Sequence, residues 1–194
     1  MKIYFITSNE GKFNEVTEAI GSVSGVELER LELSYPEIQG ETLEHVVKFA
    51  MGWLKEHLED KYLEHTVMIE DSGLFVNRLK GFPGIYSAYV HRTIGGYNAV
   101  LTLMEGEWDR RAHFETCIGI LGQVEEPKLF VGKCDGTLAN DARGTGGFGY
   151  DPIFIPEGEK RTFAEMSVEE KNKFSHRGKA LMDLKKFLAD TNIR

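Results

Sequence analysis

A short apolar strand followed at once by a helical pattern opens the chain, and this order restricts the possible folds more than any other feature. Residues 3–6 (Ile-Tyr-Phe-Ile) form an apolar run that is typical of a buried strand. Phe13, Val16 and Ile20 then recur at helical spacing, and residues 26–33 alternate imperfectly as a second strand. This alternation of strand and helix predicts the α/β class.

Two further segments of the first half fit the same class. Thr42 is the expected N-cap of a helix, whose buried face is formed by Leu43, Val46, Val47, Ala50 and Leu54. Residues 66–69 read as a short buried strand, which is expected to end in the polar residues Glu70, Asp71, Ser72 and Gly73.

The second half adds a hairpin and two helices. Residues 112–120 alternate cleanly, and they are expected to pair with residues 128–134 across a turn near residues 125–127. A short strand is expected at 153–155, and Ser167 with Glu170 forms a capping box before a short helix. Residues 181–188 predict a last amphipathic helix. We therefore expect one α/β domain, residues 1–194, built on a mixed sheet.

Composition excludes several classes of protein. The net charge is -8, which argues against a surface that binds a nucleic acid polymer, whereas small anions stay admissible. No apolar run approaches the roughly 18 residues that span a bilayer, and the apolar N-terminal stretch is too short for a signal peptide. Cys117 and Cys134 lie in expected strands without metal-site spacing, so they are expected to be buried free thiols. We expect a cytoplasmic protein.

The first candidate site is the segment Thr7-Ser8-Asn9-Glu10-Gly11-Lys12, between the first strand and the first helix. A helix N-terminus offers free N–H groups and a positive dipole end, both suited to phosphate, and Lys12 adds an ammonium group. The alternative is an ordinary capped helix with a surface lysine.

The second candidate site consists of carboxylates. Glu70 and Asp71 follow an expected buried strand, and Glu41 lies in a separate acidic loop. A magnesium ion that bridges phosphates needs only two or three protein carboxylates because it keeps several waters. The alternative is a pair of turn carboxylates exposed to water.

Two further segments are candidates for nucleotide binding. Residues 144–149 formally match GxGxxG, but a strand rather than a helix is expected after them, which argues against a dinucleotide site. Phe148 and Asp151 there could stack on and hydrogen-bond a flat ligand, although a plain hairpin loop with a core phenylalanine is the alternative. Basic residues gather near the last helix, in the runs Lys171-Asn172 and Ser175-His176-Arg177, where they are candidates for binding an anion. The alternative is an ordinary helix start exposed to water.

In this order the segments resemble the inosine triphosphate pyrophosphatase family, which removes abnormal purine nucleotides such as ITP, dITP and XTP. The matching segments are TSNEGK, YPEIQGE, EDSG, GFPG, GGFGYDPIF, TFAEM and KNKFSHR, and they run from residue 7 to residue 177. The resemblance implies an elongated mixed sheet flanked by helices, two lobes with the nucleotide cleft between them, and a homodimer.

The resemblance also implies roles for residues. Glu41 and Asp71 would bind Mg²⁺, and Asp71 would activate the attacking water with Glu70 beside it. Lys12 would hold the triphosphate and take part in catalysis, and Lys48 is a looser match. The remaining residues expected to bind the substrate are Thr7, Ser8, Asn9, Ser72, Phe148, Gly149, Tyr150, Asp151, Lys171, Ser175, His176 and Arg177.

One segment departs from the family pattern. Related sequences often have an arginine soon after the serine of Tyr86-Ser87-Ala88-Tyr89, and this chain does not. Two rival functions are a related pyrophosphatase for modified pyrimidine or methylated nucleotides and a nucleotide sensor without catalysis. The Ser175-His176-Arg177 run argues against the first, and Lys12 with Glu41 and Asp71 argues against the second.

Overall fold

The strands form one mixed sheet in the computed structural model, which describes residues 1–21, 23–124 and 126–191. The strand order is β2-β1-β3-β4-β5-β6. β1 pairs in parallel with β2 and β3, and the other neighbours pair antiparallel. This arrangement confirms the predicted α/β class and mixed sheet. The strands are β1 (Lys2–Ile6), β2 (Glu27–Leu31), β3 (Thr66–Val76), β4 (Arg111–Gly122), β5 (Lys128–Leu138) and β6 (Phe154–Pro156).

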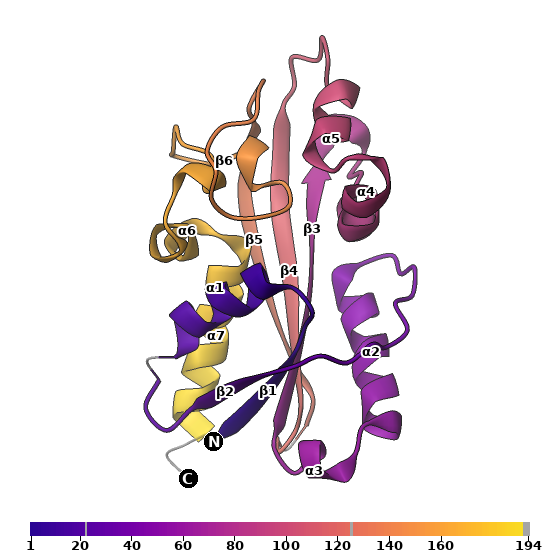
Figure 1. Cartoon of the computed structure of the whole chain (residues 1–194), viewed down its shortest axis with the longest axis vertical. Coiled ribbons are helices and arrows are strands. Elements are labelled where there is room, and N and C mark those ends of the chain that lie inside the picture. The colour runs from indigo at the N-terminus through magenta and orange to yellow at the C-terminus, as the bar shows by residue number, and fades with distance from the viewer. Residues whose placement is uncertain (22, 125, 192–194) are drawn as a thin grey trace.

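Helices cover both faces of this sheet (Figure 1). The α-helices are α1 (Glu10–Ile20), α2 (Leu43–His57), α3 (Asp60–Leu63), α4 (Ser87–Ile94), α5 (Tyr97–Leu103), α6 (Val168–Phe174) and α7 (His176–Thr191). Short 3₁₀ turns occur at η1 (Asn77–Leu79), η2 (Gly84–Tyr86), η3 (Asp151–Ile153) and η4 (Phe163–Glu165). Figure 1 shows α1 and α7 on one side of the long strands and α2 on the other, with α4 and α5 farther along the molecule's long axis.

The apolar side chains of the described residues form three clusters that correspond to these layers. One cluster joins α1 and α7 to β1, β3 and β4, and it contains Val16, Ile20 and Leu181. Another lies under α2 and contains Leu43, Val47 and further residues of the predicted face. The third fills the end of the sheet near α5 and β6. Burying the predicted apolar faces therefore holds helices on both sides of the strands that carry the acidic residues.

The length of β3 differs from the prediction. We expected a strand that ends at residue 69, but β3 continues through the polar residues to Val76. β1 pairs with β3 only as far as Met68, whereas β4 pairs with it along its whole length. The acidic pair Glu70-Asp71 therefore lies in mid-strand, just beyond the end of β1, because backbone pairing to β4 overrides the local polarity.

Most of the local predictions agree with the structure. The Thr42 hydroxyl accepts a hydrogen bond from the His45 N–H at the start of α2, and the capping box of Ser167 and Glu170 opens α6. Cys117 and Cys134 are free and buried. The last strand is displaced slightly, since residues 151–153 form η3 before β6 begins. Residue 125 of the predicted turn lies outside the described residues.

No helix in the described ranges is both long and apolar enough to cross a bilayer.

Candidate active site

The first turn of α1 lies at one wall of a large cleft. β1 ends at Ile6, and Asn9 is the N-cap of α1: its side chain accepts from the Lys12 N–H at 3.0 Å, and the Thr7 hydroxyl accepts from the Asn9 N–H. A Cβ on Gly11 would collide with the Phe148 ring, so this turn requires glycine. The structure thus brings the first helix N-terminus against the glycine-rich loop.

A buried network of charges lies behind this wall and accounts for most of the charged residues singled out in the sequence. Lys171 Nζ contacts Glu15 Oε1 at 2.6 Å and Asp151 Oδ2 at 2.5 Å. Arg177 pairs with both Glu15 and Glu70, and its Nη2 lies 3.0 Å from Glu70 Oε1. Buried charges of this kind need partners, and here three carboxylates meet three cations when Lys12 is included.

Lys12 connects the network to the cleft. Its Nζ lies 2.7 Å from Glu70 Oε2, and the Glu70 side chain is fully buried. Burial would raise the pKa of Glu70, but Arg177 and Lys12 hold it well below its usual range. Glu70 is therefore a fixed anion that positions Lys12 and Arg177, and it is poorly suited to accept a proton.

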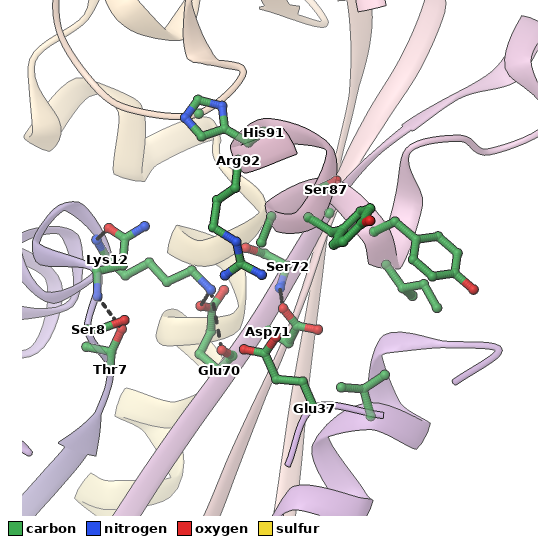
Figure 2. A pocket seen from close by; sticks show the side chains of 18 of the residues that line it. Thr7, Ser8, Lys12, Glu37, Glu70, Asp71, Ser72, Ser87, His91 and Arg92 are labelled. Carbon is green, nitrogen blue, oxygen red and sulfur yellow. Dashed lines mark hydrogen bonds and ion pairs between the residues drawn. The ribbon is translucent and has the colours of Figure 1, made fainter. Parts of the chain in front are cut away.

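Asp71 has the opposite environment. Burial raises its pKa to about 6; Lys12 opposes this rise, and Glu70 and Glu37 add to it. Among the described residues, no cation pairs with its carboxylate, which accepts a hydrogen bond from the Ser72 N–H at 2.8 Å. Figure 2 shows Glu37 and Asp71 facing the same space. Asp71 and Glu37 are therefore two carboxylates that could meet the same ligand in the cleft.

Glu41 is not where the sequence predicted. It is exposed immediately before the N-cap of α2 and does not line the cleft, whereas Glu37, four residues earlier, does. Lys48 is exposed as well: Val46 and Ala50 of α2 face the cleft, and helical geometry directs the residue between them outward. We therefore replace Glu41 by Glu37 as the candidate partner of Asp71.

The glycine-rich loop lies beside the first turn of α1 and also lines the cleft. The Phe148 N–H donates to Asp151 Oδ2 at 2.8 Å, and the Lys171 ammonium lies 4.8 Å from the centre of the Phe148 ring. His176 is buried and stacks on Phe114. Ser175 lies behind the cleft, where its hydroxyl accepts from the Gly178 N–H.

These elements enclose a cleft of about 1280 Å³, which is large enough for a nucleoside triphosphate. Of the residues predicted to bind, catalyse or hold metal, all line it except Glu41, Lys48 and Ser175. The sequence reading missed Glu15, Glu37 and Arg92. Glu15 gave no usable signal, because it lies outside the predicted face of Phe13, Val16 and Ile20.

Comparison with known proteins shows the family of this chain. The profile of the Ham1 family matches residues 3–187. The chain belongs to the Ham1 family. The dITP/XTP pyrophosphatase of Pyrococcus horikoshii is 55% identical over 93% of both chains, and that of Thermococcus kodakarensis is 48% identical over 98% of both. These relatives confirm the family that the sequence motifs predicted.

Solved structures of Ham1 proteins show the same fold. The Staphylococcus aureus Ham1 protein has a TM-score of 0.79 at 32% identity, and the match covers 98% of this chain and 100% of that one. The Coxiella burnetii HAM1 protein gives 0.78 at 29% identity, with 98% and 99% covered. The fold predicted for this Ham1 chain is therefore confirmed at the level of the mixed α/β sheet.

Proposed function

We propose that this chain hydrolyses dITP, ITP and XTP to the nucleoside monophosphate and pyrophosphate. The observation that carries the proposal is the contrast between the two neighbouring carboxylates on β3. Glu70 is neutralised by two cations, whereas no cation within the described part of the chain pairs with Asp71, whose pKa is raised to about 6. A cleft that holds one carboxylate as an anchor and leaves its neighbour free to accept a proton is suited to activating water.

The residues divide between the phosphates and the base. The N–H groups at the start of α1 and the Lys12 ammonium suit the triphosphate. Beside the first turn of α1, Phe148 offers a ring for stacking on a purine. His176 Nδ1 and Arg177 Nε are buried without a hydrogen-bond partner among the described residues, so polar atoms of a base can satisfy them.

The reaction uses these groups directly. A water positioned by Asp71 attacks the α-phosphorus and gives its proton to the Asp71 carboxylate, and the bond from that phosphorus to the β-phosphate oxygen breaks. Lys12 and the α1 N-terminus stabilise the negative charge that develops on the leaving pyrophosphate. No covalent enzyme intermediate is required.

Magnesium fits this donor set. The described part of the chain has no group of three or more His, Cys, Asp or Glu side chains that could enclose an ion. Mg²⁺ bound to a nucleotide needs only one or two protein carboxylates beside phosphate oxygens and waters. Asp71 and Glu37 would hold it, and it would neutralise phosphate charge when bound. A cytoplasmic location and a homodimer are further parts of this proposal.

Assays with different nucleotides and product analysis test the proposal. In the presence of Mg²⁺, kcat/KM should be highest for ITP, dITP or XTP and lower for ATP by about tenfold or more, because adenine presents a donor at C6 in place of an acceptor. Each turnover should release one pyrophosphate and one monophosphate. Orthophosphate with a nucleoside diphosphate would contradict the cleavage site, the absence of turnover would favour a nucleotide sensor, and a preference for modified pyrimidines would favour the related pyrophosphatase.

A further inference from the structure

The cations of the cleft differ in whether their charge is already neutralised. Four Lys or Arg side chains of the described residues line it, and three of them pair with buried carboxylates. Lys12 pairs with Glu70, and Lys171 and Arg177 pair with Glu15 behind the wall. Those charges mostly offset one another before any ligand enters. The cleft is also lined by the carboxylates Glu32, Glu37, Glu70, Asp71 and Asp151.

Arg92 is the fourth cation and differs from the others. Within the described ranges it forms no hydrogen bond or ion pair, and its side chain is exposed. Figure 2 shows its guanidinium directed from α4 into the cleft, toward Lys12, Glu70 and Ser72. A long flexible cation that extends over acidic residues without pairing with them is available to an anionic ligand.

The fold explains why α4 can present this residue to the site. A Cβ on Gly73 of β3 would collide with the Gly84 carbonyl, so the glycine lets η2 pack directly on the strand next to Asp71 and Ser72. The Ser87 hydroxyl at the start of α4 accepts from the Leu74 N–H at 2.9 Å and donates to the Gly84 carbonyl. The start of α4 is therefore attached to the strand that carries Asp71, and Arg92 lies in its last turn.

We propose that Arg92 binds the triphosphate chain of the substrate from the α4 side of the cleft, opposite the N-terminus of α1. The inference rests on the proposed function and deepens it by naming the cation whose charge is available to the ligand. Its guanidinium can donate two parallel hydrogen bonds to phosphate oxygens, which a lysine cannot do.

Binding of inorganic tripolyphosphate tests this without requiring turnover. By calorimetry, Arg92→Ala should weaken tripolyphosphate binding by about ten- to a hundredfold, the usual range for hydrogen bonds to a charged group, and Arg92→Lys should fall between parent and Ala. Lys186→Ala removes the same charge from an exposed position on α7 and should leave binding unchanged. Calorimetric binding of inosine, which has no phosphate, should be the same in Arg92→Ala and the parent.

Each outcome either supports or overturns the proposed role of Arg92. Equal tripolyphosphate affinity in the parent and Arg92→Ala overturns the proposal, even if the parent hydrolyses ITP. A parallel loss of inosine binding also overturns it, because it would reveal a general disturbance of the cleft. A selective loss of tripolyphosphate binding supports it, and this result would stand even if the parent failed to hydrolyse ITP and the proposed function were rejected.

Discussion

Asp71 carries a charge that its surroundings disfavour. Burial raises its pKa to about 6, so the folded state prefers the protonated carboxyl more than the unfolded chain does. The stability that this preference supplies is complete below the ordinary aspartate pKa and is lost as the pH rises through about 6. At neutral pH the ionised Asp71 therefore destabilises the fold, as expected where a site has been shaped for chemistry.

Replacing Asp71 by Asn should separate activity from stability. Activity with ITP should fall by roughly a hundredfold or more, because the substitution removes the base and a candidate metal ligand together. The free energy of unfolding at neutral pH should rise by about 2 to 3 kcal/mol, since a disfavoured charge is removed. Steady-state kinetics and urea unfolding measure the two effects, and near-normal turnover would show that another group activates the water.

Lys12 differs from the surface lysine that the sequence alone allowed. Its side chain is mostly buried and pairs with a fully buried carboxylate. Lys12→Met should lower kcat/KM for ITP by about a hundredfold, because a charge-assisted contact to phosphate is lost. The free energy of unfolding should fall by only about 1 to 2 kcal/mol, because Arg177 and Thr116 still hydrogen-bond to Glu70. A kcat/KM equal to that of the parent would place the phosphate site elsewhere.

At the scale of elements, buried charges connect parts of the chain that are far apart in sequence. Glu15 on α1 pairs with Lys171 on α6 and with Arg177 on α7, and the Asn172 side chain donates to the Glu15 carbonyl. Arg177 then reaches Glu70 on β3. The network therefore fixes the first and last helices against the strand that carries Asp71. It also means that Arg177→Ala would disturb the fold as well as any contact with the base.

Glu15→Gln tests this connection while keeping the side chain's size. It leaves Lys171 and Arg177 with less buried negative charge, and removing one partner from a buried ion pair costs about 3 to 5 kcal/mol. Glu18→Gln changes an exposed carboxylate on the same helix and should stay within about 0.5 kcal/mol of the parent. Urea unfolding of both variants measures the difference. Equal stability would mean that the network holds no element in place.

At the scale of the whole molecule, local sequence patterns predicted helices and strands better than they predicted which residues contact one another. The apolar periodicity of α1, α2 and α7 was sufficient because burial of one face decides those helices. The length of β3 depended on pairing with β4, which no local pattern around residues 70–73 reveals. Positions 37 and 41 are both glutamates of the same acidic loop, so residue type does not distinguish them. Only the path of the loop before α2 decides that Glu37, and not Glu41, lies near Asp71.

The stability of the whole chain should fall as the solution becomes mildly acidic, because of a buried histidine. Burial keeps the pKa of His176 well below its usual range, with Arg177 and Lys171 adding to the effect. The unfolded chain takes up a proton on this residue as the pH falls below about 6.5, whereas the folded chain does not. The stabilising contribution of neutral His176 is therefore present above that pH and is lost below it.

Asp71 has the opposite effect on stability over the same pH range, because the folded chain takes up a proton on Asp71 as the pH falls through about 6. In His176→Gln the loss of unfolding free energy between pH 7 and pH 5 should be smaller than in the parent by on the order of 1 to 2 kcal/mol. In Asp71→Asn the loss should be larger than in the parent, since the opposing proton uptake is gone. Urea unfolding at several pH values measures how the unfolding free energy changes with pH. This change can be compared even when a variant is less stable than the parent. Parallel curves for all three proteins would show that neither group's charge depends on folding.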